Sequence, residues 1–344
     1  MQPTITIGLD IAKHVFQVHA VDANGAIVIR RKLRRSELLS FFEGLEPCLV
    51  GLEACATAHH WARSIMALGH QVKLMPPAYV KPYVKRQKND AADAAAICEA
   101  VSRPSMRFVP VKDVDQQGVL VLHRTRDLLI RQRTMLINAL RAHLAEFGII
   151  MRQGRAGVAA LVASVEEGKA EHLPELARTA LMSLIAQLRD AHARANEIER
   201  EILTWHRNDE LSRRLETIPG VGPITASAVV ATVTDPSMFA SGRELAAWIG
   251  LVPRQSSSGG KERLGRISKK GDPYIRRLLV VGAHSVLRIA HSKKPHSSNL
   301  IDWGAELAAR KPYKLAAVAL ANKMARIVWA LMAKDEVYRR QMPA

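Results

Sequence analysis

Residues 4–10 read Thr4-Ile5-Thr6-Ile7-Gly8-Leu9-Asp10, a stretch in which apolar side chains alternate and a carboxylate closes the run. Alternation of this kind predicts a β-strand with one buried face. Two more strands are predicted over 15–21 and 26–33, and Asn24-Gly25 between them is a strong signal for a hairpin turn. We therefore expect the chain to begin with three antiparallel strands.

Helices and strands alternate after these three strands. They are predicted, in chain order, over 36–45, 48–53, 58–68 and 71–75. A further helix begins near Asp90. Three antiparallel strands followed by helix, strand, helix and strand is the order of the ribonuclease H-like fold, in which acidic groups at adjacent strand ends and on a late helix converge. We therefore expect residues 1–110 to form an α/β domain of this class.

Four carboxylates occupy the positions that this fold would bring together. Asp10 and Glu53 end predicted strands, whereas Asp90 and Asp93 lie three residues apart at a helix start and so share one helix face. Clustered carboxylates repel one another and need a cation, and oxygen ligands suit Mg²⁺ or Mn²⁺. Two ions about 4 Å apart would stabilise the attacking and leaving oxygens of a phosphoryl transfer. We expect a metal site here, with a structural cluster of neutral carboxylates as the alternative.

The net charge of +18 is distributed unevenly along the 344 residues. Residues 1–110 hold 14 basic and 9 acidic side chains, residues 111–210 hold 14 of each, and residues 211–344 hold 22 and 9. An excess concentrated in the last third is expected of a surface that binds a polyanion such as DNA. A merely solubilising surface does not require such segregation. Together with the carboxylates, the charge predicts chemistry on phosphodiesters.

The cysteines and the hydropathy indicate the compartment. Cys48, Cys55 and Cys98 lack metal-ligand pairing and fit a reducing cytoplasm. The N-terminus lacks a basic segment that leads into an apolar one, and no uninterrupted apolar run is long enough to cross a bilayer. We expect a cytoplasmic protein without a membrane partner.

Residues 111–210 are predicted to be helical. Apolar residues recur there at alternating spacings of three and four, which is a heptad pattern. They are Leu181, Leu184, Leu188, Ala191, Ala195, Ile198, Ile202 and Trp205. A second helical stretch covers about 116–147. The pattern fits a coiled coil that joins two chains and fits equally well a helical hairpin that packs within one chain.

Residues 211–344 are predicted to be mainly α-helical. Ile218-Pro219-Gly220-Val221-Gly222-Pro223 resembles a helix–hairpin–helix turn, in which Gly220 and Gly222 allow a tight bend and the amides of the next helix can meet a phosphate. A plain turn between helices is the alternative. A loop rich in Ser, Gly and Arg follows over 250–271, and its composition alone identifies no nucleophile, because serine needs activation.

Basic residues on both sides of this loop are expected to contact nucleic acid. They are Arg254, Lys261, Arg263, Arg266, Lys269, Lys270, Arg276 and Arg277.

The motifs of these regions occur in a definite order. They are Gly8-Leu9-Asp10-Ile11-Ala12-Lys13, Leu52-Glu53-Ala54, Lys88-Asn89-Asp90-Ala91-Ala92-Asp93-Ala94, Ile218-Pro219-Gly220-Val221-Gly222-Pro223, Gly250-Leu251-Val252-Pro253, Ser258-Gly259-Gly260-Lys261 and Gly265-Arg266-Ile267-Ser268-Lys269-Lys270-Gly271. As a set that covers nearly the whole chain, they resemble the DEDD transposases of bacterial insertion sequences, the IS110 family with its IS1111 branch.

The resemblance implies three regions: a ribonuclease H-like (RuvC-like) domain over 1–110, a coiled coil over 111–210 and a transposase domain over 211–344. It implies that the metal ligands are Asp10, Glu53, Asp90 and Asp93. It also implies that Ser258 is a nucleophile that forms a phosphoserine link with cleaved DNA, after which strands are rejoined through a junction intermediate. Ser257 is a rival within the run of three serines.

The resemblance further implies partners. These are DNA, a guide (bridge) RNA encoded by the element, and further copies of the chain in a dimer or tetramer that shares its active sites. One motif departs from the family pattern: Glu-Ala-Thr-Gly is common after the second carboxylate, whereas this chain has Glu53-Ala54-Cys55-Ala56.

Other functions would use the same features. A resolvase-like endonuclease specific for branched DNA would use the carboxylates with water and would not need Ser258. A non-catalytic nucleic-acid-binding protein would tolerate Asp90→Asn. An actin-like or sugar-kinase domain shares the fold, but it places a glycine-rich phosphate loop after the first strand, where this chain has Ile11-Ala12-Lys13-His14.

Overall fold

The computed structural model describes residues 5–85, 89–150, 152, 154–167, 173–292 and 298–339. The chain divides into two compact units, Met1–Asp115 and Gln116–Ala344. The finer division into three regions at residues 110 and 210 stays a prediction.

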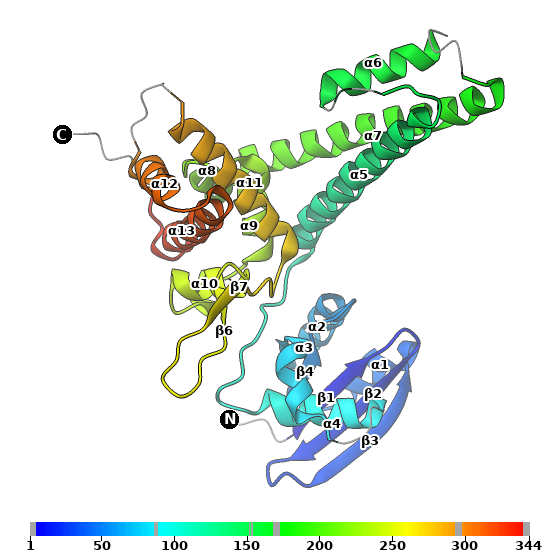
Figure 1. The fold of residues 1–344 in the computed structure, drawn as a ribbon. Coiled ribbons are helices and arrows are strands. Elements are labelled where there is room, and N and C mark those ends of the chain that lie inside the picture. The colour runs from blue at the N-terminus through cyan, green and yellow to red at the C-terminus, as the bar shows by residue number, and fades with distance from the viewer. Residues whose placement is uncertain are drawn as a thin grey trace. The chain divides into compact units, whose positions relative to one another are not determined.

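The first unit is built on a five-stranded sheet in the order β3-β2-β1-β4-β5 (Figure 1). Its strands are β1 (Ile5–Ile11), β2 (Val15–Asp22), β3 (Ile27–Arg34), β4 (Leu49–Glu53) and β5 (Gln71–Met75). The first three strands pair antiparallel, whereas β4 and β5 run parallel to β1. The mixed α/β class is confirmed, and so is the predicted chain order of three antiparallel strands followed by helix, strand, helix and strand.

The hairpin between β2 and β3 forms as its sequence predicts. Asp22 accepts hydrogen bonds at Oδ1 from the amides of Asn24 (2.9 Å) and Ala26 (2.8 Å). Gly25 takes a positive φ of 81°, which glycine adopts without a steric penalty. This turn makes β3 the outer edge of the sheet.

Helices cover both faces of the sheet. On one face, α1 (Leu38–Glu43) and α2 (Ala58–Ala67) bury an apolar core that includes Phe16, whose ring meets Trp61 edge-on at 5.2 Å. On the other face lies α4 (Asp90–Val101), preceded by the short α3 (Pro77–Val80). The sheet therefore lies between two helical layers. The layer formed by α4 carries Asp90 and Asp93.

The second unit is mainly helical, as predicted. Its elements are α5 (Val114–Ala145, which begins just before the unit boundary), α6 (Arg155–Glu166), α7 (Glu175–Asn208), α8 (Glu210–Glu216), α9 (Pro223–Thr232), α10 (Gly242–Trp248), β6 (Pro253–Gln255), β7 (Leu264–Ile267), α11 (Pro273–Ala290), α12 (Asn299–Arg310) and α13 (Tyr313–Lys334). Residues 250–271, expected to be a loop, contain the antiparallel hairpin β6–β7.

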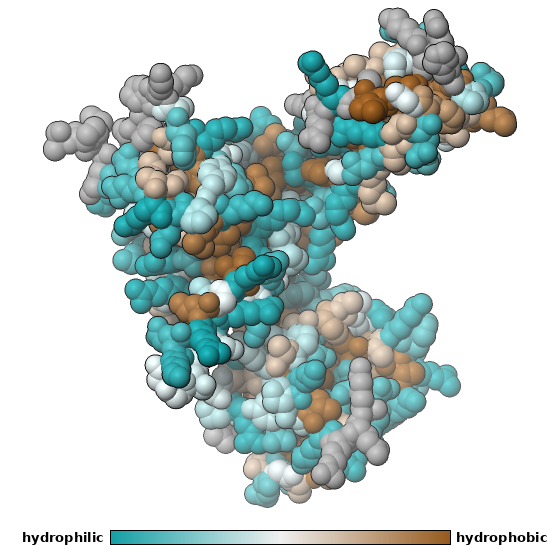
Figure 2. All heavy atoms as spheres, viewed as in Figure 1, coloured by the Kyte–Doolittle hydropathy of each residue, from teal (hydrophilic) through white to brown (hydrophobic). Residues whose placement is uncertain are grey.

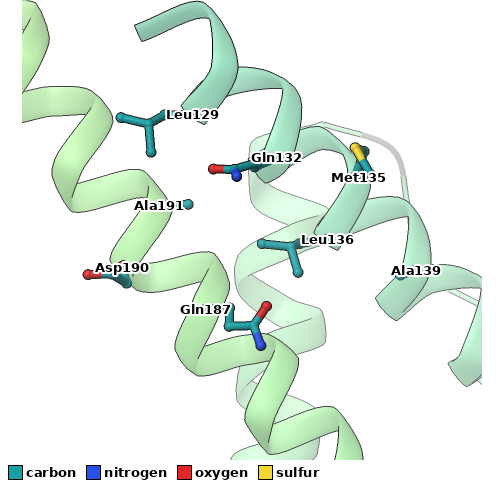
Figure 3. A pocket seen from close by; sticks show the side chains of 8 residues that line it. All are labelled: Leu129, Gln132, Met135, Leu136, Ala139, Gln187, Asp190 and Ala191. Carbon is teal, nitrogen blue, oxygen red and sulfur yellow. The ribbon is translucent and has the colours of Figure 1, made fainter. Parts of the chain in front are cut away.

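The long helices α5 and α7 pair within the chain. Arg126 of α5 forms an ion pair with Glu199 of α7 at 2.7 Å. A groove of about 440 Å³ lies between them, where Leu129 and Leu136 of α5 face Ala191 of α7 (Figure 3). Hydrophobic side chains are exposed on this part of the second unit (Figure 2), and Leu176 of α7 is one of the exposed large hydrophobic residues. A coiled coil between two chains stays a prediction.

The helix α13 has the length and apolar character of a membrane span. Half of its apolar stretch is buried inside the protein, however. Leu320, Met324 and Val328 are fully or almost fully buried in the core of the second unit. Burial of this kind is typical of a core helix.

Candidate active site

Two glycines allow α4 to lie directly on the sheet. Gly8 of β1 and Gly51 of β4 are partners in the parallel register. A Cβ on Gly8 would overlap the backbone of α4 and lie 2.7 Å from Cys98 Cβ, and a Cβ on Gly51 would lie 2.7 Å from Val101 Cβ. Any larger residue at either position would force α4 away from the sheet.

The first turn of α4 presents the two aspartates. Asn89 is the N-cap, and its side chain accepts a hydrogen bond from the amide of Ala92 at 2.8 Å. Asp90 and Asp93 lie in the first turn, where the helix dipole favours negative charge. Lys88, which precedes this cap in the sequence motif, lies outside the described residues.

The structure brings three of the predicted ligands together. Asp10, Asp90 and Asp93 each offer a carboxylate oxygen, and these oxygens lie within 4.8 Å of one another. Asp10 follows Gly8 by two residues on β1, and α4 starts above the same face of the sheet. The pairing of β1 with α4 thus joins residues 80 positions apart in the chain.

Glu53 belongs to the same edge of the sheet. It is the last residue of β4, two beyond Gly51, and therefore lies on the face that carries Asp10. Its charge also acts on Asp10, as the pKa of that residue shows.

The pKa of Asp10 is raised from 3.8 to about 6. Burial is the largest cause, followed by the charges of Asp93, Asp90 and Glu53, and the Ile11 amide partly offsets them. Burial and the charges of Glu53 and Asp10 also raise the pKa of the Cys55 thiol. Cys55, which belongs to the motif that differs from the family pattern, therefore lies near these carboxylates. Like charges at this density favour a bound cation.

The donor set fits a hard divalent cation. Asp10, Asp90 and Asp93 supply only carboxylate oxygens, which Mg²⁺ and Mn²⁺ prefer over nitrogen or sulfur. Asp10 must lose its proton to serve as a ligand, so proton and cation compete for this site.

The serine loop is a hairpin of the second unit. Ser258 and Lys261 form an isolated antiparallel bridge, and Gly259 and Gly260 between them take positive φ values of 57° and 75°. Positive φ at both central residues is the requirement of a tight two-residue hairpin turn. The turn places Ser258 beside the tip of an exposed β-ribbon.

The two candidate serines differ in their surroundings. The Ser257 hydroxyl accepts a hydrogen bond from the Arg263 amide at 3.2 Å. The exposed Ser258 hydroxyl has no hydrogen-bond partner within the described part of the chain. Within the described residues, the Ser258 hydroxyl is therefore the less engaged of the two.

Most of the predicted basic contacts are exposed on or beside this hairpin: Arg254, Lys261, Arg263, Arg266, Lys269 and Lys270. Arg276 has a different position, because its Nη1 donates to the carbonyl oxygens of Ile249 (2.7 Å) and Lys270 (2.8 Å) and so ties the ends of the loop together. Arg277 pairs with Asp127 of α5 and lies over the Tyr274 ring. Their roles in nucleic-acid binding stay predictions.

The predicted turn joins α8 to α9. Gly220 takes a φ of 85°, and a Cβ there would lie 2.7 Å from a methyl group of Val286 and 2.8 Å from the Gly282 carbonyl oxygen. Gly220 is therefore required for packing against α11. Gly222 caps α9, is exposed and has open space around it, which leaves this end of α9 accessible. Its contact with phosphate stays a prediction.

Sequence reasoning missed the packing role of Gly8 and Gly51. The available signal was an isolated glycine within each of two strands, which often marks a close approach of another backbone. The proximity of Cys55 to the carboxylates left no such signal.

Both parts of the chain match models of known transposases. Residues 7–149 match a model described as a transposase, of the IS110 DEDD type, and residues 212–298 match the IS116/IS110/IS902 transposase family. A probable family 20 transposase of Pseudomonas aeruginosa is 50% identical over 334 residues, which cover 97% of this chain and 98% of that protein.

The chain belongs to the IS110/IS116/IS902 family of transposases.

Two further relatives carry the names of insertion sequences. The transposase for IS1328 of Yersinia enterocolitica is 41% identical over 98% of this chain and 100% of its own length. The transposase for IS1111A of Coxiella burnetii is 41% identical over 97% and 91%. The transposase described here therefore carries the carboxylates in one family-matched region and the serine hairpin in the other.

Proposed function

We propose that this transposase cuts and rejoins DNA strands by transesterification at a divalent-metal site. The proposed ligands are Asp10, Glu53, Asp90 and Asp93, and the proposed nucleophile is Ser258. The observation that carries the metal site is the convergence of three carboxylates within 4.8 Å, with the Glu53 charge acting on one of them. Family membership supports divalent metal use.

The proposed chemistry exchanges one phosphodiester for another. The Ser258 oxygen attacks phosphorus, the bond from phosphorus to one deoxyribose oxygen breaks, and that oxygen takes up a proton. A strand-end hydroxyl later attacks the phosphoserine and releases Ser258. A bound Mg²⁺ or Mn²⁺ ion would neutralise phosphate charge and help deprotonate the serine.

The chain's own residues have separate roles in this proposal. The carboxylates hold the cation and thereby position the phosphate. The basic side chains around the hairpin, such as Arg254 and Lys261, stabilise the added negative charge of the pentavalent state. The close turn at Gly259-Gly260 keeps the backbone beside Ser258 free of side chains, which allows a phosphate to approach.

We also propose that the transposase acts as a homo-oligomer, a dimer or a tetramer, with a guide RNA encoded by its element. The RNA proposal rests on the family resemblance of the sequence motifs. Pairing by RNA would supply sequence choice while the protein contacts backbone. The oligomer proposal rests on the same family resemblance, because Leu188, Ala191 and Ala195 of the heptad pattern of α7 are buried within this chain.

The test is to trap the covalent intermediate. Purified transposase with its co-purified RNA is incubated with Mg²⁺ and DNA that carries an element end and a nick that prevents rejoining, and the attached residue is mapped by mass spectrometry. We expect an adduct on Ser258, its loss in Ser258→Ala and its retention in Ser257→Ala. Unimpaired cleavage by Ser258→Ala would instead favour a resolvase-like endonuclease that uses water.

A further inference from the structure

The edge strand β3 carries a row of cations on the face of the sheet that holds the carboxylates. Asp10 pairs with Gln17 of β2, and Gln17 pairs with Lys32 of β3. Directly paired residues point to the same face, and side chains two apart along a strand do so as well. Arg30, Lys32 and Arg34 therefore project from the Asp10 face.

The distances suit a single stretch of nucleic-acid backbone. Strands lie about 4.8 Å apart, so the Cα of Lys32 lies about 10 Å from that of Asp10. Along β3, successive members of the row are about 7 Å apart. Each side chain is long enough to contact a phosphate close to one held at the carboxylates.

The row is open to solvent. The helix α4 packs on β1, β2 and β4, and all three cations beyond it are exposed. In the described residues no carboxylate pairs with any of them. Glu37, which follows closely in the chain, bonds the amide of Arg34 at 2.7 Å. Three neighbouring, exposed positive charges are suited to a polyanion.

His19 is the β2 neighbour of the row on this face. It lies on β2 between Gly8 and Arg30, and its pKa is lowered by burial and then by the Arg30 charge. Arg31 points the other way, and its guanidinium lies 5.9 Å from the centre of the Phe41 ring of α1. Charged edge strands also prevent sheets from pairing with one another, and this simpler purpose predicts no difference between the two faces.

We propose that Arg30, Lys32 and Arg34 form a phosphate-binding track that guides the DNA backbone toward the carboxylates. The proposal rests on the proposed function, in which the carboxylates hold the phosphate that is cut. It adds a DNA contact in the first unit to those expected around the serine hairpin.

The test compares Lys32→Gln with Arg31→Gln. The two substitutions remove one charge from adjacent positions of the same strand, but on opposite faces. DNA affinity of the full-length protein is measured by fluorescence anisotropy with a labelled 30-base-pair duplex of mixed sequence, across a series of salt concentrations. Thermal unfolding of each variant checks that the fold is retained.

Each phosphate contact contributes about −0.9 to the slope of log affinity against log salt concentration. For each contact, raising the salt concentration from 50 to 200 mM therefore lowers the affinity by about 3.5-fold. Over that range, the fold loss of affinity should be about 3.5 times smaller for Lys32→Gln than for the wild-type protein, and about 40 times smaller for R30Q/K32Q/R34Q. Arg31→Gln should match the wild type.

Equal slopes for Lys32→Gln, Arg31→Gln and the wild type would overturn the track, as would a reduced slope that appears with duplex RNA and not with DNA. Metal-dependent cleavage of element-end DNA by the wild type and by Asp90→Asn is measured in parallel. If Asp90→Asn cleaves normally, the proposed function is wrong, and the track then depends on the salt slopes alone.

Discussion

Replacing Gly8 by alanine tests whether α4 is held against β1 as the structure shows. The new Cβ would overlap the carbonyl oxygen of Ala94 and lie 2.7 Å from Cys98 Cβ. Carbon atoms normally make contact at about 3.5–4.0 Å, so α4 must move by about 1 Å. Overpacking of this kind typically lowers the free energy of unfolding by about 1–3 kcal/mol.

The same movement would separate the carboxylates. Asp90 and Asp93 move with α4, whereas Asp10 stays on β1. A misplacement of about 1 Å can cost about 100-fold in rate, because the reacting groups lose their alignment. We therefore expect Gly8→Ala to unfold at a lower temperature, to bind Mn²⁺ more weakly and to cleave DNA about 100-fold more slowly.

The assay is thermal unfolding of the full-length transposase with and without Mn²⁺, together with cleavage of element-end DNA. Gly44→Ala is the control, since Gly44 has an ordinary φ of −83° and its nearest atoms to a new Cβ lie 3.8 Å away. Wild-type stability and wild-type cleavage in Gly8→Ala would contradict the close packing of α4 on β1 and the positioning role derived from it.

Three further predictions follow from the same geometry. The pKa of Asp10 is about 6 in the folded state, compared with the ordinary value of 3.8. The metal-free folded state therefore binds this proton more tightly than the unfolded state does, and the free energy of unfolding should fall as pH rises from 3.8 to 6. Denaturant unfolding in a chelator should show this slope, and Asp10→Asn should abolish it. Asp90→Asn should remove metal-dependent cleavage in a gel assay while DNA affinity stays within about threefold, because a neutral side chain replaces one proposed ligand. Leu188→Ala should destabilise the second unit by about 2–4 kcal/mol in denaturant unfolding, because Leu188 is buried among Leu140 and Leu144; an unchanged midpoint would contradict the packing of α5 with α7.

The sequence was sufficient to predict the first unit closely. Alternating apolar residues and Asn24-Gly25 predicted the antiparallel strands within one residue at each end that the structure describes. The strand over 71–75 was predicted without error. These signals are local, because strand periodicity and turn chemistry depend on neighbouring residues. The convergence of Asp10 with Asp90 is not local, and it was expected only because the order of elements indicated the fold.

Other features depend on contacts that the sequence does not display. The loop over 250–271 contains the hairpin β6–β7, which Arg276 stabilises from α11 by binding two carbonyl oxygens. Arg276 and Arg277 were grouped with exposed cations by composition, whereas the structure engages one with backbone and the other with Asp127. The same heptad pattern serves packing within one chain or between chains, so the pairing of α7 with α5 could not be chosen from periodicity.

The most direct test of the metal site is a titration of the metal-free transposase with Mn²⁺, followed by isothermal calorimetry and by the electron paramagnetic resonance signal of free Mn²⁺. We expect binding by the wild type, loss of binding in Asp10→Asn and Asp90→Asn, and unchanged binding in Asp22→Asn, whose carboxylate serves the distant β2–β3 turn. Equal Mn²⁺ affinity in the wild type and in the Asp10 and Asp90 variants would contradict this expectation.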